Sequence, residues 1–265
     1  MRIEQPIYIE GQIQQRRKAI LDFLQEKRFV RTVQLSNKFG ISEVSIRKDL
    51  DFLEERGLVK RIHGGAQLAS DALSLLDLTE RYLVNRTAKE QIAREAVKLI
   101  GKPGQQIYID TGTTTLLLSR LIPRDFSIII FTCSLSTIAA LEGRPLCKVV
   151  TFGGVIDYKD KLCISPWDDF QLSRYHFDIL FAGANSVFED GFGCDDLAQT
   201  EQLRKAISRS RISYVLADSS KANKKTYHTY AESNKVEAWI TDGKVDTSFV
   251  KAFQAKGGKV IIAES

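Results

Sequence analysis

Short apolar runs alternate with helical patterns between residues 106 and 263, and this alternation constrains the fold more than any other feature. Helical patterns at 114–121, 137–141, 201–210 and 248–255 separate most of the apolar runs. Strands that alternate with helices in this way predict an α/β domain, whose mostly parallel sheet is covered by helices. The expected strands are 106–110, 127–131, 148–152, 178–183, 212–217, 238–241 and 259–263.

The segment Asp110-Thr111-Gly112-Thr113-Thr114-Thr115 follows the first of these strands and opens a helix. Gly112 allows the backbone to turn and expose its N–H groups, and the threonine hydroxyls add further donors beside a helix N-terminus. Such a site suits a phosphate, although an ordinary cap of the helix by threonine explains the segment equally well. The segment lacks the Gly-Lys-[Ser/Thr] of a Walker A loop and the glycine spacing of a dinucleotide site.

Polar groups follow three other expected strands, in Thr132-Cys133-Ser134, Gly183-Ala184-Asn185 and Asp218-Ser219-Ser220-Lys221. Ligands of parallel sheets bind at the carboxyl ends of strands, so we expect these groups to face one crevice. The ammonium group of Lys221 could neutralise a phosphate or a carboxylate. Glu201 and Lys205 stand four residues apart on a helix, and by themselves they indicate a surface ion pair more than a sugar contact.

The first 67 residues predict a separate helical module. A helix is expected over 12–27, and a short second helix has Thr32 as its N-cap, Val33, Leu35 and Phe39 as its apolar face, and Gly40 at its end. Ser42 is expected to cap a third helix that runs to about residue 56 and is stopped by Gly57. In this third helix Ile46, Leu50 and Leu53 share one face, which predicts packing on the first two helices.

The other face of the third helix carries Val44 and Lys48, with Ser45 and Arg47 on its flanks. Short, polar and cationic groups near a helix N-terminus suit the major groove of DNA and its phosphates. A hairpin with Gly64-Gly65 at its tip follows, and Lys60, Arg61 and His63 make it a basic wing. A lone histidine is a poor metal ligand, so we predict no metal site there.

These elements together predict a winged helix-turn-helix, with a generic three-helix bundle as the alternative. The charge distribution favours DNA: residues 1–67 hold 13 Lys/Arg and 9 Asp/Glu, against 25 and 24 in the other 198 residues. The expected domains are the winged helix-turn-helix over 12–67, a linker over 68–86 and the α/β domain over 87–265. The last of these is expected to open with a capping box at Thr87-Ala88-Lys89-Glu90 and a helix to about Ile100.

The four cysteines lie outside metal-ligand spacing, and no apolar run approaches the length of a membrane span. The N-terminus lacks the apolar core of a signal peptide. We therefore expect a cytoplasmic protein without a metal, a cofactor or a membrane partner.

The N-terminal module resembles that of the DeoR family of bacterial sugar-responsive transcription regulators. The resemblance rests on Ser42-Glu43-Val44-Ser45-Ile46-Arg47-Lys48-Asp49-Leu50, Leu53-Glu54, Gly57 and His63-Gly64-Gly65-Ala66. It continues in order through residues 110–115, Gly153-Gly154, Phe177-Asp178, Gly183, Gly191, Glu201, Lys205 and 218–221. It implies that the second domain is an effector domain resembling ribose-5-phosphate isomerase folds, in which the Gly-Thr loop holds a sugar phosphate.

The resemblance and the residue patterns together give two sets of site residues. The expected DNA contacts are Thr32, Glu43, Val44, Ser45, Arg47, Lys48, Lys60, Arg61, His63 and Gly64. The expected effector contacts are Asp110, Thr111, Gly112, Thr113, Thr114, Thr115, Gly183, Asn185, Glu201, Lys205 and Lys221. The sequence departs from the family pattern at Thr132-Cys133, at Cys163-Ile164-Ser165-Pro166-Trp167 and at Ser220-Lys221-Ala222, segments that line or neighbour the expected effector pocket.

The expected function is that of a DNA-binding regulator that represses a sugar-catabolism operon. A phosphorylated sugar is expected to control it, and it is expected to act as a homodimer or homotetramer. The alternative is a sugar-phosphate isomerase with an accessory DNA-binding domain, in which Glu201 or Asp110 is the base and Lys221 the electrophile. A DNA-packaging protein is disfavoured because the second domain is nearly neutral. We expect no catalytic residues.

Overall fold

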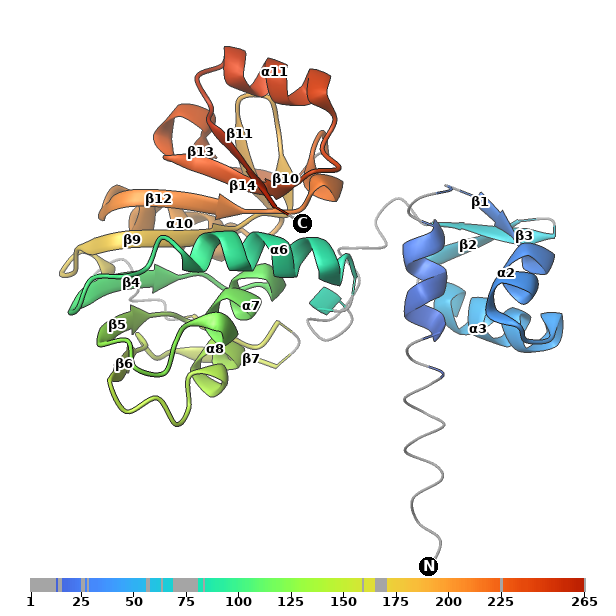
Figure 1. Ribbon diagram of the computed structural model, residues 1–265, viewed down its shortest axis with the longest axis horizontal. Coiled ribbons are helices and arrows are strands. Elements are labelled where there is room, and N and C mark those ends of the chain that lie inside the picture. Colours follow the sequence, from blue (N-terminus) through green and yellow to red (C-terminus); the bar gives the residue numbers. More distant parts are fainter. Residues whose placement is uncertain are drawn as a thin grey trace, which may run out of the picture. The chain divides into compact units, whose positions relative to one another are not determined.

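The computed structural model describes residues 13, 16–24, 27, 29–55, 58–62, 64–68, 81–82, 84–158, 160–164, 171–224 and 226–264. The chain divides into two compact units, Met1–Asn85 and Arg86–Ser265 (Figure 1). Within the described residues, no helix combines the length and the apolar character that crossing a membrane requires.

The first unit has the helices and the small antiparallel sheet of a winged helix-turn-helix, which confirms the predicted fold. Residues 16–24 are helical, and the sheet has the order β1-β3-β2. The other elements are β1 (Phe29–Arg31), α2 (Thr32–Phe39), α3 (Glu43–Glu55), β2 (Val59–Ile62) and β3 (Gly65–Leu68).

The apolar face of α3 forms the centre of this unit, as its periodicity predicted. Ile46, Leu50 and Leu53 are buried against Ile20 and Leu24 of the preceding helix and against Leu35 of α2. The Ser42 hydroxyl accepts a hydrogen bond from the N–H of Ser45 at 3.2 Å, so Ser42 caps α3 as expected. The sequence pattern therefore determined both the start of α3 and the side that it buries.

The start of α2 differs from the prediction. Its N-cap is Arg31, whose N–H donates to the Gln34 side chain at 3.0 Å, and Thr32 is the first helical residue. The Thr32 N–H donates to the carbonyl of Gly64 at 2.9 Å, and its side chain is buried. Val33, expected on the apolar face, is exposed instead. The hairpin thus fixes the beginning of α2, and this contact could not be read from local spacing.

The wing contains a strand that the sequence did not predict. This strand, β1, pairs with β3, with Arg31 opposite Gly65. It was not predicted because three residues are too few to give a periodic signal. Ile62 lies opposite Gly65 across the hairpin, so Gly65 belongs to β3, and the predicted Gly64-Gly65 tip is wrong by one residue. The expected linker over 68–86 lies largely outside the described residues, and Leu68 at its start belongs to β3.

The second unit contains a seven-stranded sheet of order β15-β14-β12-β9-β4-β5-β6, in which every pair is parallel. All seven strands were predicted, with ends that agree within two residues. They are β4 (Gln105–Ile109), β5 (Ile128–Phe131), β6 (Cys147–Val150), β9 (Phe177–Gly183), β12 (Ser210–Leu216), β14 (Ala238–Asp242) and β15 (Val260–Ala263).

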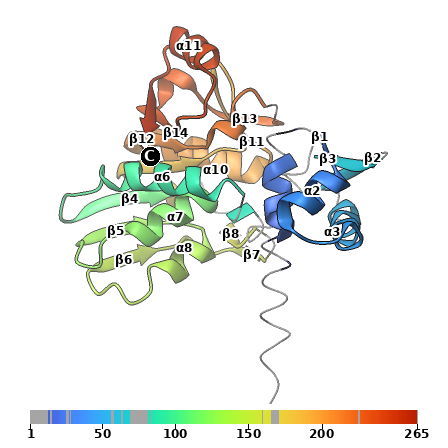
Figure 2. The ribbon, with the colours of Figure 1, turned by 45° about the vertical axis from the view of Figure 1, so that its right-hand side comes forward.

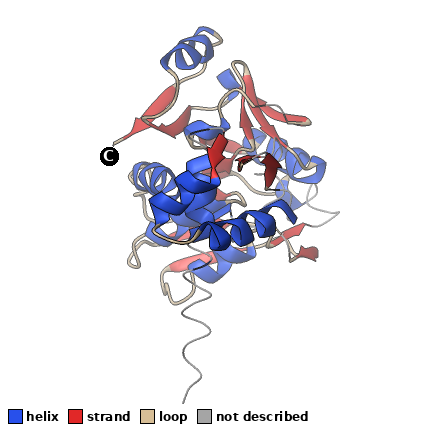
Figure 3. Ribbon diagram, turned by 90° about the vertical axis from the view of Figure 1, so that its right-hand side faces the viewer, coloured by secondary structure: helices blue, strands red, loops and turns tan. Residues whose placement is uncertain are grey.

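Helices cover both faces of this sheet. The helices α6 (Arg86–Val97), α7 (Thr113–Leu121) and α8 (Leu135–Ala140) lie on one face, while α10 (Leu197–Ser208) lies on the other (Figures 1 and 2). The helix α11 (Thr247–Ala255), uppermost in Figure 3, packs Phe249 and Phe253 against Trp239 of the sheet. The alternating pattern therefore produced the predicted α/β layers.

Smaller elements escaped prediction because they are short. They are the antiparallel sheet of β10 (Ser186–Val187), β11 (Gly191–Cys194) and β13 (His228–Glu232), the hairpin of β7 (Val155–Asp157) and β8 (Leu162–Ile164), and the 3-10 turns η1 (Ser219–Lys221) and η2 (Ser233–Lys235).

The start of α6 also corrects the prediction. The helix begins at Arg86, so Thr87 is its second residue and not its cap. Glu90 accepts a hydrogen bond from Arg86 at 2.7 Å, one helical turn away, instead of completing a capping box. The helix ends at Val97, three residues before the predicted end. The residues of a capping box are present in the sequence, but Glu90 binds the Arg86 side chain and does not cap the helix.

The order of the strands marks one place in the sheet as a binding position. From β4 in the middle, the chain moves outward through β5 and β6, and then returns to build β9, β12, β14 and β15 on the other side of β4. In open parallel sheets, ligands bind outside the carboxyl ends of strands where this order reverses. The reversal here lies between β4 and β9, at the ends marked by Ile109 and Gly183.

Candidate functional sites

The outer face of α3 carries half of the expected DNA contacts. Val44 is 62% exposed, Arg47 and Lys48 are exposed, and Ser45 is half-buried. Glu43 accepts a hydrogen bond from Arg47 at 3.3 Å on the same helix. The structure therefore brings these five side chains together along the first turns of a helix whose opposite face is buried.

The wing divides the remaining candidates. Lys60 is exposed, and Gly64 has a φ of +76°, as a tight turn requires, while His63 lies outside the described residues. Arg61 is committed to α3: its guanidinium pairs with Asp51, and its N–H donates to Glu54 at 2.8 Å. Arg61 is thus placed to fix the wing on α3, and the buried Thr32 does not present its side chain to a DNA groove.

The loop after β4 opens α7 as the sequence suggested. Gly112 has a φ of +139°, and its carbonyl accepts the first intrahelical hydrogen bond, from Leu116 N–H at 3.1 Å. The N–H groups of the three intervening threonines therefore precede that bond, which is the arrangement of an anion site at a helix N-terminus. Thr115 uses its hydroxyl within the loop, because it donates to the Gly112 carbonyl at 3.1 Å.

Asp110 fastens the two strands at which the order of the sheet reverses. Its carboxylate accepts a hydrogen bond from Gly183 N–H at 3.0 Å, so the end of β4 is tied to the end of β9. Burial raises the pKa of Asp110 to about 7, against the opposing effect of hydrogen bonds from the N–H groups of Gly183 and Thr111. Asp110 is therefore a buried carboxyl group that holds the ends of β4 and β9 together, and its pKa lies near neutral pH.

Two residues beneath this fastening were not foreseen. The Tyr230 hydroxyl donates to the Gly183 carbonyl at 2.8 Å, and burial raises the pKa of Tyr230 well above its usual value. Burial likewise raises the pKa of Cys194 to about 11, and the charge of Asp110 contributes to both shifts. Asp110, Tyr230 and Cys194 are all buried, so charges in this region interact more strongly than they would in water.

Lys221 lies at the carboxyl end of β12, next to β9 in the sheet. It closes η1, which the Asp218 side chain caps by accepting from Ser220 N–H at 3.1 Å. Lys224 follows three residues later, and burial together with the charge of Lys221 lowers its pKa to about 8. Two ammonium groups thus lie near each other at this strand end, within the electrostatic reach of Asp218.

The polar residues after β5 do not face a crevice, contrary to expectation. Thr132, Cys133 and Ser134 are buried, and their side chains bond within the protein. Ser134 N–H donates to the Thr132 hydroxyl at 3.1 Å, and the Ser134 hydroxyl caps α8 by accepting from Thr137 N–H at 3.1 Å. The Cys133 thiol donates to the Gln202 side chain at 3.3 Å. The hydroxyls of Thr132 and Ser134 therefore bond to backbone N–H groups of the turn and of α8 instead of facing a ligand.

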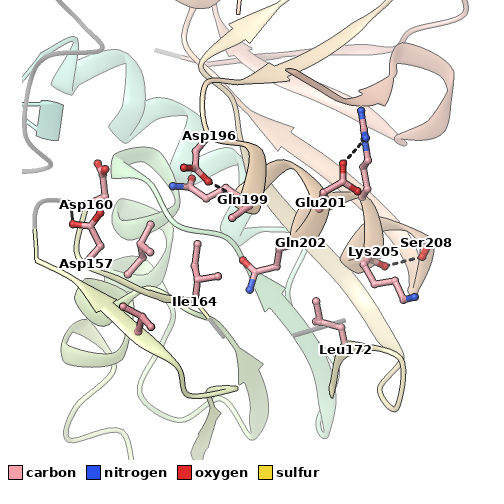
Figure 4. A pocket seen from close by; sticks show the side chains of 14 residues that line it. Asp157, Asp160, Ile164, Leu172, Asp196, Gln199, Glu201, Gln202, Lys205 and Ser208 are labelled. Carbon is pink, nitrogen blue, oxygen red and sulfur yellow. Dashed lines mark hydrogen bonds and ion pairs between the residues drawn. The ribbon is translucent and has the colours of Figure 1, made fainter. Parts of the chain in front are cut away.

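A cavity of about 870 Å³ lies between α10 and the hairpin β7–β8. Glu201 and Lys205 line it, together with Asp157 and Asp160 of the hairpin and Asp196, Gln199 and Gln202 around α10 (Figure 4). Glu201 forms an ion pair at 2.6 Å with Arg204, which precedes Lys205 on the helix. Arg204 is one residue closer along the helix, and it also donates to the Thr229 carbonyl of β13.

The effector candidates therefore fall into two groups. The residues after β4 and β9 gather at the reversal of the sheet, with Lys221 one strand away, whereas Glu201 and Lys205 line the cavity. Asn185 belongs to the turn between β9 and β10, where its N–H donates to the Gly193 carbonyl at 2.9 Å. Among the described residues, no group of three or more His, Cys, Asp or Glu side chains is placed to hold a metal ion.

Three acidic residues were not predicted from the sequence: Asp157 and Asp160 of the cavity and the buried Asp49 of α3. Asp157 and Asp160 lie on a hairpin too short to be recognised, so no signal marked them. Asp49 did carry a signal: it lies three residues after Ile46 and four before Leu53, and a carboxylate at such a core position requires a partner.

The comparisons with known proteins agree with this architecture. Residues 16–72 match the family described as DeoR-like helix-turn-helix domain, and residues 84–243 match that described as DeoR C terminal sensor domain. The HTH-type transcriptional regulator FruR of Bacillus subtilis, itself uncharacterised, is 32% identical over 231 residues, which cover 87% of this chain and 91% of that protein. The lactose phosphotransferase system repressor of Staphylococcus epidermidis is 30% identical over 220 residues, covering 80% and 85%.

Ribose 5-phosphate isomerase A of Methanocaldococcus jannaschii has a TM-score of 0.40 and 24% identity, over 53% of this chain and 56% of the isomerase, a likeness too partial to bear on function. The two family matches together span most of the chain, in the same order as the two structural units. The chain therefore belongs to the DeoR family of transcription regulators, with an N-terminal DNA-binding helix-turn-helix domain and a C-terminal sensor domain.

Proposed function

We propose that this regulator represses a sugar-catabolism operon and that its sensor domain binds a phosphorylated sugar at the loop that opens α7. The observation that carries the proposal is the position of this loop. Gly112 places the N-terminus of α7 at the reversal of the sheet, where Asp110 ties the ends of β4 and β9 together. A phosphate there meets the N–H groups of the first helical turn and the positive end of the helix dipole.

The charges of the cavity beside α10 support the same placement. Asp157, Asp160, Asp196 and Glu201 outnumber Arg204 and Lys205 among its lining residues. A dianionic phosphate would be repelled by this surplus of carboxylates, while the hydroxyls of a sugar would find acceptors there. We therefore assign the phosphate to the α7 loop, and Glu201 and Lys205 to contacts with the uncharged part of the effector.

The effector must bind two states of the regulator with different affinity in order to change its binding to DNA. Coupling energies of this kind are typically about 1–3 kcal/mol. A single winged helix covers little DNA, so the proposal includes a homodimer or homotetramer that reads paired half-sites. The relative from Staphylococcus epidermidis is named a repressor of a sugar system, which agrees with the proposed role.

An isomerase activity finds less support in the geometry. Such an enzyme needs a carboxylate beside the substrate carbon. Glu201 is exposed and paired with Arg204, and Asp110 is buried and bonded to Gly183 N–H. The regulator is thus the function that these observations support better, and absence of aldose–ketose interconversion with pentose and hexose phosphates would agree with it.

The phosphate site predicts a specific loss in Thr114→Val. With the full chain, we expect one member of a panel of pentose and hexose monophosphates to raise the unfolding temperature, while the unphosphorylated sugar does not. A ligand at a hundredfold excess over its Kd adds about 2.7 kcal/mol to the free energy of unfolding. Thr114→Val removes a hydroxyl at the second residue of α7, so it should abolish much of this stabilisation.

The matched control is Thr87→Val, because Thr87 is the second residue of α6 and is exposed. This variant should keep the full response to the sugar phosphate. If no phosphorylated sugar raises the unfolding temperature, or if both variants respond alike, then the proposed effector site is wrong.

The outer face of α3 predicts a loss of DNA binding in Lys48→Ala. We expect roughly tenfold weaker binding to a duplex that the unmodified chain selects from a random library, because a cation at the groove is removed. Titrations at several salt concentrations should show a slope reduced by about one if Lys48 contacts a phosphate. Lys102→Ala removes the same charge from an exposed site of the second unit, and equal losses in both variants would contradict the assignment.

A further inference from the structure

Asp49 is a buried carboxylate at the centre of the DNA-binding domain. Its side chain is 2% exposed, although it belongs to the helix whose outer face carries Arg47 and Lys48. Two consecutive arginines of the helix at residues 16–24 each bind one of its two oxygens, Arg16 Nε at 2.6 Å and Arg17 Nε at 2.9 Å. Both arginine side chains are themselves mostly buried, with 23% and 22% exposed.

This arrangement is costly if stability is its only purpose. Removing a carboxylate and two guanidinium groups from water costs free energy, and apolar side chains of similar volume often stabilise a core as well or better. What a bonded carboxylate adds is direction, because each hydrogen bond restricts distance and angle. Two bonds to different oxygens therefore fix the plane of the Asp49 carboxylate, and with it the rotation of α3.

A second contact holds the same helix one turn further along. The guanidinium of Arg17 lies 3.6 Å from the centre of the Phe52 ring, and Phe52 follows Asp49 by three residues. On the other side, Arg61 of β2 pairs with Asp51. The helix α3 is thus held from the first helix through Asp49 and Phe52, and from the wing through Asp51.

Rotation of α3 matters because the DNA contacts lie at its surface. Side chains extend the radius of a helix to about 5–6 Å, so a rotation of about 20° moves an outer group by roughly 2 Å. That shift exceeds the range over which a hydrogen bond to a base edge is kept. Contacts with phosphates through long, mobile lysines tolerate it better, so base reading should suffer before general affinity does.

We propose that Asp49, gripped by Arg16 and Arg17, is a positioning residue that sets the rotation of α3 and thereby the sequence selectivity of DNA binding. The inference depends on α3 being the helix that reads DNA. The Lys48→Ala comparison tests that premise separately, because it removes an outer side chain without touching the ion pairs.

The test measures the ratio of affinities for the selected duplex and for a scrambled duplex, at a temperature where unfolding curves show every variant folded. In Asp49→Asn, we expect affinity for the selected duplex to fall roughly tenfold or more while affinity for the scrambled duplex changes little. Ile20→Val is the matched control, because it removes one methyl group from the same buried core and leaves the ion pairs intact. Its ratio should stay that of the unmodified chain.

Arg16→Lys provides a second variant in case Asp49→Asn does not fold. It keeps the positive charge that attracts DNA but loses the Nε donor, so the ratio should fall without a general loss of affinity. A ratio that is unchanged in a folded Asp49→Asn or Arg16→Lys chain overturns the proposal. If Lys48→Ala has no effect on the selected duplex, the choice of α3 itself is at fault.

Discussion

Gly65→Ala should unfold the winged helix-turn-helix domain and abolish DNA binding, while the sensor domain stays folded. A Cβ atom at this position would lie well inside contact distance of the Val30 carbonyl oxygen, and 2.8 Å from the Phe29 ring. The Val30 carbonyl cannot withdraw easily, because β1 is paired with β3 on both sides of it, at Phe29 and at Arg31. Forcing extra atoms into a packed site costs about 1–3 kcal/mol and more where backbone must move, so we expect about 3 kcal/mol.

Hydrogen exchange measured by mass spectrometry would check this result on the full chain. Amides in 16–68 should lose protection, and those in 86–264 should keep it, because the two units are separate compact bodies. Gly101→Ala is the control, because open space surrounds its Cβ position and its φ is not positive. Protection of 16–68 equal to that of the unmodified chain would show that β1 does not pack on Gly65 as described.

Asp110→Asn should make the sensor domain clearly more stable at pH 8 and change its stability little at pH 4. The folded protein raises the pKa of Asp110 to about 7 through burial, from about 3.9 in an unfolded chain. The folded state therefore binds the proton more tightly, and this contribution to stability is complete below about pH 4 and is lost as pH rises through 7. Asparagine cannot ionise, and its side-chain oxygen can still accept from Gly183 N–H.

The expected size of this effect is large. Each tenfold change in the acid dissociation constant is worth about 1.4 kcal/mol, so the unmodified chain should lose up to about 4 kcal/mol between pH 4 and pH 8. Urea unfolding at pH 4 and pH 8 measures the loss, which should be absent in Asp110→Asn. Asp125→Asn, at an exposed carboxylate, should keep the pH dependence of the unmodified chain. A pH dependence that is the same in Asp110→Asn would show that Asp110 does not ionise as inferred.

Local periodicity accounts for what was predicted of the fold. The seven strands of the parallel sheet, the burial of Ile46, Leu50 and Leu53, and the cap at Ser42 all follow from spacings within a few residues. The three-residue strand β1 and the hairpin β7–β8 were missed because segments of that length carry no period. Thr87 was misassigned because Arg86 competes for Glu90, and a motif alone does not decide between two partners.

The candidate sites divide along the same line. The sequence marked the loop around Gly112 and the outer face of α3, since each is a continuous segment whose backbone or helical face is set locally. It could not show that Arg61 is bound to Asp51, that the groups after β5 turn inward, or that Glu201 pairs with Arg204. Each of those outcomes depends on which of several nearby partners the packed structure brings within bonding distance.

The sequence by itself determined the two domains' fold classes, the buried and exposed faces of α3 and the glycine-threonine loop at a strand end, because each is encoded by neighbours along the chain. Only the tertiary structure decided that Asp110 binds Gly183 and that Asp49 is gripped by Arg16 and Arg17, pairs that lie 73, 33 and 32 residues apart. Burial makes these distant pairs strong and moves the proton equilibrium of Asp110 toward neutral pH, and burial exists only once the elements have packed.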